Sequence, residues 1–132
     1  MAPDLERCLA DFFRRDSRSA AAVYLFGSEA RGDARPDSDV DLGVLLAGTP
    51  PSTFDAQPYD LEGALERLLG RHVDVVILNR APVDLRARVL RHGRLILDRD
   101  PSARIQFELR TRNEAFDFEP VLREYRKARP GR

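Results

Sequence analysis

The chain has 132 residues, a length that fits one compact domain and leaves no room for a separate substrate-binding domain. Its 22 basic side chains balance 22 acidic ones, so no net positive charge favours binding to DNA. A single cysteine excludes an intrachain disulfide, and the longest apolar runs are too short to cross a bilayer. Because the charged N-terminal segment does not resemble a signal peptide, we expect a cytoplasmic protein without a membrane anchor.

The first half of the chain predicts one helix, two strands and a loop. Apolar residues recur at helical spacing over Asp4–Arg15, which is typical of an amphipathic helix. The continuous apolar run Ala20–Phe26 predicts a strand buried on both faces, and Val40–Leu46 predicts a second strand. Glycine and proline residues over Ala47–Pro58 predict a long loop after that strand.

The second half of the chain predicts alternating helices and strands. Helices are expected over Tyr59–Leu69 and Val83–His92, each followed by a glycine suited to close it. Strands are expected over His72–Leu78 and Leu95–Leu97.

A last helix is expected to open at Asp100 and Pro101, and Pro120 is expected to break or kink it. The order of these elements favours an α/β (α+β) domain in which helices flank a small mixed β-sheet.

Gly27 and Ser28 directly follow the first predicted strand. A glycine there permits a sharp turn and the close approach of a phosphate. The next residues, Glu29–Arg31, can start a short helix whose N–H groups point at that phosphate. The Ser28 hydroxyl and the Arg31 guanidinium would add further donors. A simple turn that binds no ligand is the alternative interpretation.

Two carboxylates, Asp39 and Asp41, lie two residues apart around the start of the second predicted strand. Alternation along a strand places them on one face, while Val40 and Leu42 point to the other face and the core. Like charges this close repel each other unless a cation lies between them, and carboxylate oxygens suit Mg²⁺. The alternative is an acidic exposed face of the sheet that binds no ion.

Asp74 is the lone charge in an apolar strand, where an unpaired carboxylate would cost free energy. If its strand lies beside that of Asp39 and Asp41, the three carboxylates share a face and suit two metal ions. An acid that pairs with an arginine at the end of a strand is the alternative. His72 shares a face with Asp74, so it lies either at the rim of such a site or in solvent.

Together these residues resemble a known pattern. A Gly-Ser pair that starts at Gly27, ten intervening residues and then Asp39-x-Asp41 resemble the polymerase-β-like nucleotidyltransferases. Ala30–Gly32 and Ser38 make the stretch similar to the minimal nucleotidyltransferases of prokaryotes. The resemblance implies a polymerase-β-like fold with a C-terminal helix.

The resemblance also implies roles for these residues. An enzyme of this kind uses ATP as its substrate and two Mg²⁺ ions as its cofactors. Its catalytic and metal-binding residues would be Asp39, Asp41 and Asp74. The residues that would hold the triphosphate are Gly27, Ser28, Arg31 and Ser38.

The C-terminal segment resembles a narrower group. Residues 103–108, residues 116–120 and Tyr125 are similar to the C-terminal region of antitoxin adenylyltransferases, which are encoded beside a HEPN ribonuclease toxin. The resemblance implies AMP transfer to a tyrosine of that toxin, and a hetero-oligomer with it is possible. It divides the chain into a nucleotidyltransferase domain (1–100) and a helical extension (101–132), which either joins that domain or binds the partner. Alternatives are a small-molecule or RNA acceptor, and an antitoxin that acts by binding alone.

Overall fold

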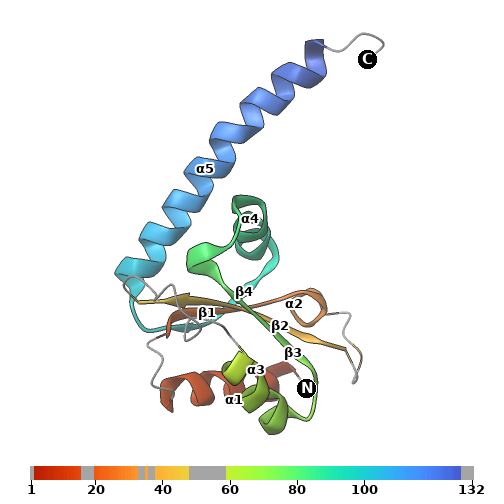
Figure 1. The fold of residues 1–132 in the computed structure, drawn as a ribbon, viewed down its shortest axis with the longest axis vertical. Helices are drawn as coiled ribbons and strands as arrows, with labels where there is room; N and C mark the ends of the chain where they lie inside the picture. Colours follow the sequence, from red (N-terminus) through yellow and green to blue (C-terminus); the bar gives the residue numbers. More distant parts are fainter. Residues whose placement is uncertain (1, 16–19, 33–34, 36–37, 48–58, 129–132) are drawn as a thin grey trace.

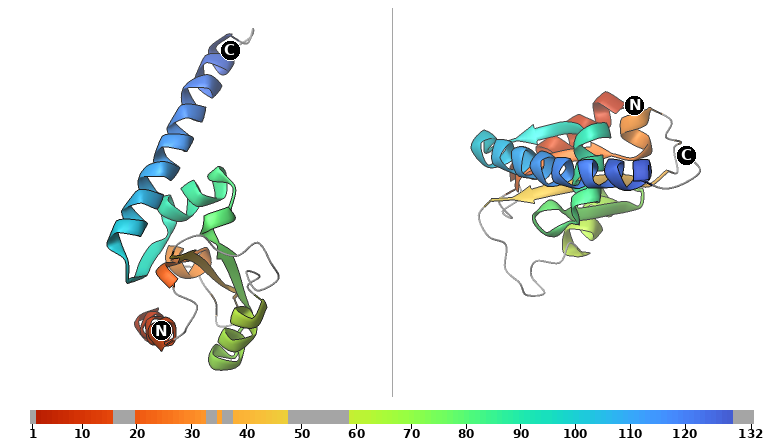
Figure 2. Two further views of the ribbon diagram at one scale, coloured as in Figure 1. Left: turned by 60° about the vertical axis from the view of Figure 1, so that its left-hand side comes forward. Right: turned by 90° about the horizontal axis from the view of Figure 1, so that it is seen from above.

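A computed structural model describes the backbone of residues 2–15, 20–32, 35, 38–47 and 59–128, and the side chains of most of them. Four strands form one sheet in the order β3-β2-β1-β4. Helices α1 and α3 cover one face of the sheet, and α4 and the start of α5 cover the other (Figures 1 and 2). The elements are α1 (Ala2–Arg15), β1 (Ala20–Phe26), α2 (Ser28–Arg31), β2 (Val40–Leu46), α3 (Tyr59–Leu69), β3 (Val73–Ile77), a 3₁₀ turn (Leu78–Arg80), α4 (Val83–His92), β4 (Arg94–Asp98) and α5 (Pro101–Ala128).

This architecture confirms the predicted mixed sheet flanked by helices with a C-terminal helix. The first helix begins two residues earlier than expected, at Ala2. Strand β3 is one residue shorter at each end than its prediction, because the chain turns into a 3₁₀ helix at Leu78. Residues 48–58 of the loop predicted over Ala47–Pro58 lie outside the described residues. No helix in the described ranges is both long and apolar enough to cross a membrane.

Pro120 was expected to break or kink the last helix, and the expectation of a break is wrong. Helix α5 runs without interruption from Pro101 to Ala128, and its second half projects away from the sheet (Figure 1). A proline removes a single backbone donor from a helix interior. The hydrogen bonds of the turns on both sides are enough to carry the helix past it.

The strand pairing fixes which residues share a face. Strand β1 pairs antiparallel with β2 and with β4, whereas β2 and β3 are parallel. In the parallel pair Asp41 lies opposite Asp74, and Leu42 lies opposite Val75. Because side chains alternate along a strand, Leu42 and Val75 point to the face covered by α1 and α3, and the two aspartates point to the opposite face.

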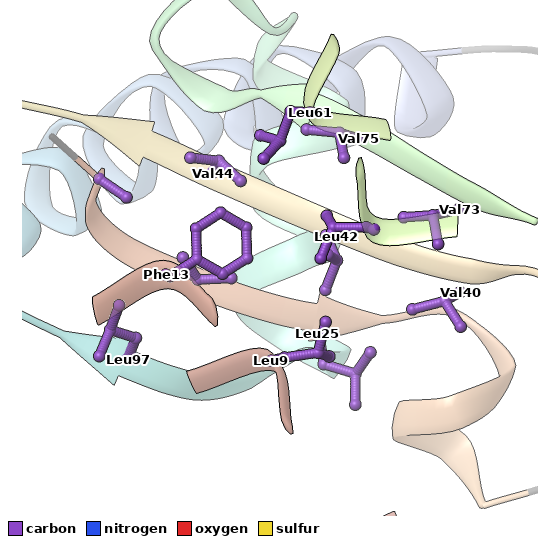
Figure 3. Packing of buried hydrophobic residues seen from close by; sticks show 13 residues of the cluster. Leu9, Phe13, Leu25, Val40, Leu42, Val44, Leu61, Val73, Val75 and Leu97 are labelled. Atoms are coloured by element: carbon purple, nitrogen blue, oxygen red, sulfur yellow. The ribbon is translucent and has the colours of Figure 1, made fainter. Parts of the chain in front are cut away.

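The larger core lies between the sheet and helices α1 and α3. Phe13 of α1 and Leu65 of α3 are almost fully buried against strands β1, β2 and β3. Figure 3 shows how side chains from these elements interdigitate. The buried members are Leu9, Phe13, Ala20, Val23, Leu25, Val40, Leu42, Val44, Leu61, Leu65, Val73, Val75 and Leu97.

A second core lies on the opposite face, under α4 and α5. Tyr24 of β1 is buried there beside Phe107 of α5. Its hydroxyl donates a hydrogen bond to Glu108 at 2.8 Å. Burial, together with the Glu108 carboxylate, raises the pKa of Tyr24. The first turns of α5 are therefore packed onto the sheet.

Phe107 anchors α5, so its loss is expected to destabilise the fold. We expect Phe107→Ala to lower the free energy of unfolding by about 3–5 kcal/mol, because the change leaves a cavity in the second core. Chemical denaturation measures this loss. Leu109→Ala on the exposed side of the same helix is the control and is expected to change stability by less than about 0.5 kcal/mol. Equal losses in both variants would contradict the packing of α5.

Strand β3 forms one edge of the sheet, and two glutamates of α3 protect that edge. Glu66 accepts a hydrogen bond from the Val73 N–H at 3.0 Å, and Glu62 accepts one from the Val75 N–H at 2.8 Å. Edge strands carry backbone donors without a strand partner. The two carboxylates satisfy these donors and tie α3 to the strand that carries Asp74.

Candidate active site

Three carboxylates meet on the α4 face of the sheet. Asp41 and Asp74 are neighbours in the parallel register of β2 and β3. Asp39, just ahead of β2, lies with Asp74 and His72 in a cluster whose potential ligand atoms are all within 4.8 Å of one another. The proximity of these acids was expected from the sequence if β3 lay beside β2, and the sheet order meets that condition.

The negative charges of the three carboxylates repel one another. Burial, followed by the charges of Asp74 and Asp39, raises the pKa of Asp41, and Arg31 and His72 only partly offset this rise. A site with this excess of negative charge and several carboxylate oxygens has the donor chemistry of a divalent cation site.

The raised pKa of Asp41 predicts how stability depends on pH. The folded protein holds the Asp41 proton more tightly than the unfolded chain does. In buffer with a chelator, stability is therefore expected to fall as the pH rises from the ordinary value of 3.8 through the raised pKa. Asp41→Asn removes this titration, so its free energy of unfolding should exceed that of the wild type near neutral pH. Urea denaturation across the acidic range checks both statements. A wild type that is the more stable protein near neutral pH would contradict them.

The Gly-Ser turn lies directly against Asp41. Gly27 has φ +73°, and a Cβ atom placed on it would lie 2.2 Å from Oδ2 of Asp41. Helix α2 starts at the next residue, Ser28, and the Arg31 N–H closes it by donating to the Gly27 carbonyl at 3.1 Å. The structure thus places the turn predicted to bind phosphate next to the carboxylate cluster.

Ser38 shapes the approach to Asp39. Its hydroxyl accepts a hydrogen bond from the Arg35 N–H at 2.8 Å, and its own N–H donates to the Arg35 carbonyl at 2.9 Å. These two bonds join Arg35 to Ser38, the residue immediately before Asp39. Contact of Ser38 with a triphosphate stays a prediction.

Sequence reasoning missed Arg71, which joins the two halves of the site. Its guanidinium donates to Glu29 of α2 at 2.5 Å and to the Ser38 carbonyl at 2.7 and 3.1 Å. The Arg71 and Glu29 side chains are only 20% and 11% exposed. An arginine after a helix-closing glycine carries no local signal that separates it from a solvated one.

Removal of Arg71 is expected to loosen the Gly-Ser turn relative to Asp39. We expect Arg71→Ala to lower kcat/KM for the nucleotide by about 10- to 100-fold, because small displacements of positioning groups have effects of this size. Steady-state kinetics measures the loss. The matched control, Arg67→Ala at an exposed position on α3, should leave kcat/KM unchanged. Equal activity of the Arg71 and Arg67 variants would rule out this positioning role.

His72 is held more firmly than a solvated strand start. Its side chain is 58% exposed, yet Nδ1 lies 2.9 Å from Glu66 Oε2 and Nε2 lies 3.1 Å from Asp74 Oδ1. Partial desolvation lowers the pKa of His72, but the charges of Asp74, Asp39 and Glu66 outweigh it and raise the pKa. The ring therefore lies within the carboxylate cluster.

Comparison with known proteins defines the class of enzyme. The family model described as polymerase beta, nucleotidyltransferase, matches residues 9–102. The chain belongs to this family. It is a nucleotidyltransferase.

The chain is similar to one characterised protein and to several solved structures. The chain is 35% identical over 77 residues to the protein adenylyltransferase MntA of Thermococcus cleftensis. The aligned segment covers 58% of this chain and 75% of that protein. It is similar to a toxin–antitoxin crystal structure with AMP-PNP, at a TM-score of 0.70, 26% identity and 93% coverage of both chains. The chain is also similar to a structure of a Shewanella oneidensis MNT antitoxin in complex with a tri-AMPylated HEPN toxin, at a TM-score of 0.68 and 24% identity. The match covers 97% of this chain and 94% of the other chain, and at this identity it supports the fold alone.

Proposed function

We propose that this protein transfers AMP from ATP to a hydroxyl group with the help of two Mg²⁺ ions. The observation that carries the proposal is the side-by-side position of Asp41 and Asp74, with the Gly27 turn against Asp41. Asp39 and Asp41 would bind both ions, and Asp74 would bind the ion nearer the acceptor. When bound, the ions would neutralise charge on the phosphates.

The residues around the cluster supply binding and proton transfer. Gly27 and Ser28 would hold the triphosphate through backbone N–H groups and a hydroxyl, and Arg31 and Ser38 would add polar contacts to it. The acceptor oxygen forms a bond to the α-phosphorus, and the bond from that phosphorus to the bridging oxygen breaks, which releases pyrophosphate. The carboxylate of Asp74 takes the proton of the acceptor hydroxyl.

The acceptor that fits best is a tyrosine of a HEPN ribonuclease toxin, which makes this protein its antitoxin. Support comes from the MntA relative at 35% identity and from the toxin–antitoxin structure at 26% identity. A small-molecule or RNA acceptor is the second candidate.

We further propose that residues 1–100 form the catalytic unit and that residues 101–132 extend it toward the partner. Phe107 and Thr111 bind the start of α5 to the catalytic unit. Beyond them the helix projects from the body, as the left view of Figure 2 shows.

Mass spectrometry of the neighbouring toxin tests the proposal. The purified protein is incubated with ATP, Mg²⁺ and the product of the adjacent gene, and the toxin is then digested and sequenced. We expect mass increments of AMP on a toxin tyrosine, and none when ATP is omitted. Reactions with GTP, CTP and UTP establish the base preference. Absence of any nucleotide increment on the toxin would overturn the proposed acceptor, and absence on RNA and small molecules as well would overturn the activity.

A further inference from the structure

We infer that His72 is a metal ligand of this site, so that a nitrogen donor joins the carboxylates of Asp39 and Asp74 and raises the affinity for first-row transition ions relative to Mg²⁺. The inference rests on the proposed metal-dependent function and specifies the metal chemistry of the same site.

The position of His72 in the sheet is the first argument. The parallel register of β2 and β3 pairs Val40 with Val73 and Asp41 with Asp74, so Asp39 and His72 lie side by side one step further along. The Val40 N–H donates to the His72 carbonyl at 2.9 Å and holds this alignment. Alternation then puts both side chains on the face of Asp41 and Asp74.

The ligand atoms are already gathered. His72 offers a ring nitrogen, and Asp39 and Asp74 each offer an oxygen, within 4.8 Å of one another. The Nε2 atom of His72 lies 3.1 Å from Asp74 Oδ1. A nitrogen and two oxygens grouped this closely can bind one ion without movement of the backbone.

Glu66 supplies the second argument. It lies 2.9 Å from His72 Nδ1, while the backbone N–H of Val73 donates to the same Glu66 oxygen at 3.0 Å. A histidine that binds a metal almost always donates its other ring N–H to a carboxylate or carbonyl, which orients the ring. Glu66 has this role here, because it lies against Nδ1 while Nε2 faces Asp74.

The donor set determines the class of ion. Mg²⁺ favours oxygen ligands and retains several waters, whereas imidazole nitrogen suits first-row transition ions. A site with carboxylates and one imidazole therefore binds Mn²⁺ and the later ions of that row more tightly than carboxylates alone would. Mg²⁺ still binds through the three aspartates.

Electron spin-echo spectroscopy with Mn²⁺ as the probe tests the inference on the purified protein, without nucleotide or acceptor. We expect modulation from a directly bound ¹⁴N nucleus in the wild type. His72→Gln should lose this signal and weaken Mn²⁺ binding by about 10-fold or more, with little change in Mg²⁺ affinity. His92→Gln changes the other histidine of the chain, which is exposed, and should retain the signal.

Glu66→Gln adds a variant that leaves His72 in place. It should weaken Mn²⁺ binding by about 10-fold, because the ring loses its charged orienting partner. Wild-type protein without a bound ¹⁴N signal, or His72→Gln protein that keeps it, would overturn the inference. Such a result combined with AMP transfer to the toxin would leave the proposed function intact. A bound ¹⁴N signal without any nucleotide transfer would contradict only the function.

Discussion

Asp39→Asn combined with Asp41→Asn is expected to reduce nucleotide transfer by about 1,000-fold or more, because the change removes two of the three anionic groups proposed to bind metal. An amide has nearly the shape of a carboxylate, so the fold should persist. The buried neighbours Val40 and Leu42 are unchanged and hold β2 in the core. The loss therefore reports on chemistry and not on folding.

The measurement is the rate of AMP incorporation into the toxin at saturating ATP and Mg²⁺. Asp84→Asn serves as the control, since Asp84 is an exposed acid in the first turn of α4. Its activity should equal that of the wild type. A double variant that retains more than about a tenth of wild-type activity would contradict the assigned metal-binding role.

The same double variant separates catalysis from binding. Cells that express the toxin are expected to lose protection when their antitoxin carries both substitutions, although a pull-down should still recover the complex. Protection by the inactive variant would instead mean that contact alone neutralises the toxin. Binding of the toxin by the proposed C-terminal extension, which contains α5, would then account for the antitoxin effect without transfer of AMP.

The sequence predicted the elements and the acidic residues well, because both depend on local patterns. Apolar runs identified β1 and β2, and the spacing of Asp39 and Asp41 placed them on one face. The position of Asp74 beside Asp41 depends on the parallel pairing of β3 with β2, which is a long-range contact. The sequence analysis could therefore predict this position only on the condition that the two strands are neighbours. The structure confirms that pairing, which places the three acids close together. Their catalytic roles stay predictions.

The supporting residues could not be predicted because their contacts join different elements, and no periodicity within one element encodes such contacts. Arg71 reaches Glu29 across 42 positions, and no spacing rule links them. Glu66 contacts His72 because α3 packs along the edge of the sheet, a tertiary relation that periodicity within α3 does not encode. For Pro120, local propensity indicated a break, but the neighbouring turns of α5 outweighed the loss of one donor.

Gly27→Ala is expected to slow nucleotide transfer strongly and to destabilise the protein, for two separate reasons. The backbone has φ +73° and ψ −151°, a region that is essentially restricted to glycine, and occupying it with alanine costs about 1–3 kcal/mol. In addition, the new Cβ would lie 2.2 Å from Asp41 Oδ2, so the carboxylate must move. Displacement of Asp41 disturbs its position beside Asp74 and is expected to lower kcat by about 100-fold or more.

Gly32→Ala is the matched control, because the chain contains a second glycine of positive φ close by. Gly32 has φ +83° at the other end of α2, and no atom of the described residues lies within 4 Å of a Cβ placed there. Its variant should show the backbone cost of about 1 kcal/mol with activity close to that of the wild type. Urea denaturation and the AMP-incorporation assay are run on both variants. If Gly27→Ala loses no more activity than Gly32→Ala, the contact between the turn and Asp41 has no part in catalysis. A selective loss at Gly27 would show that the turn and the carboxylate act as one unit.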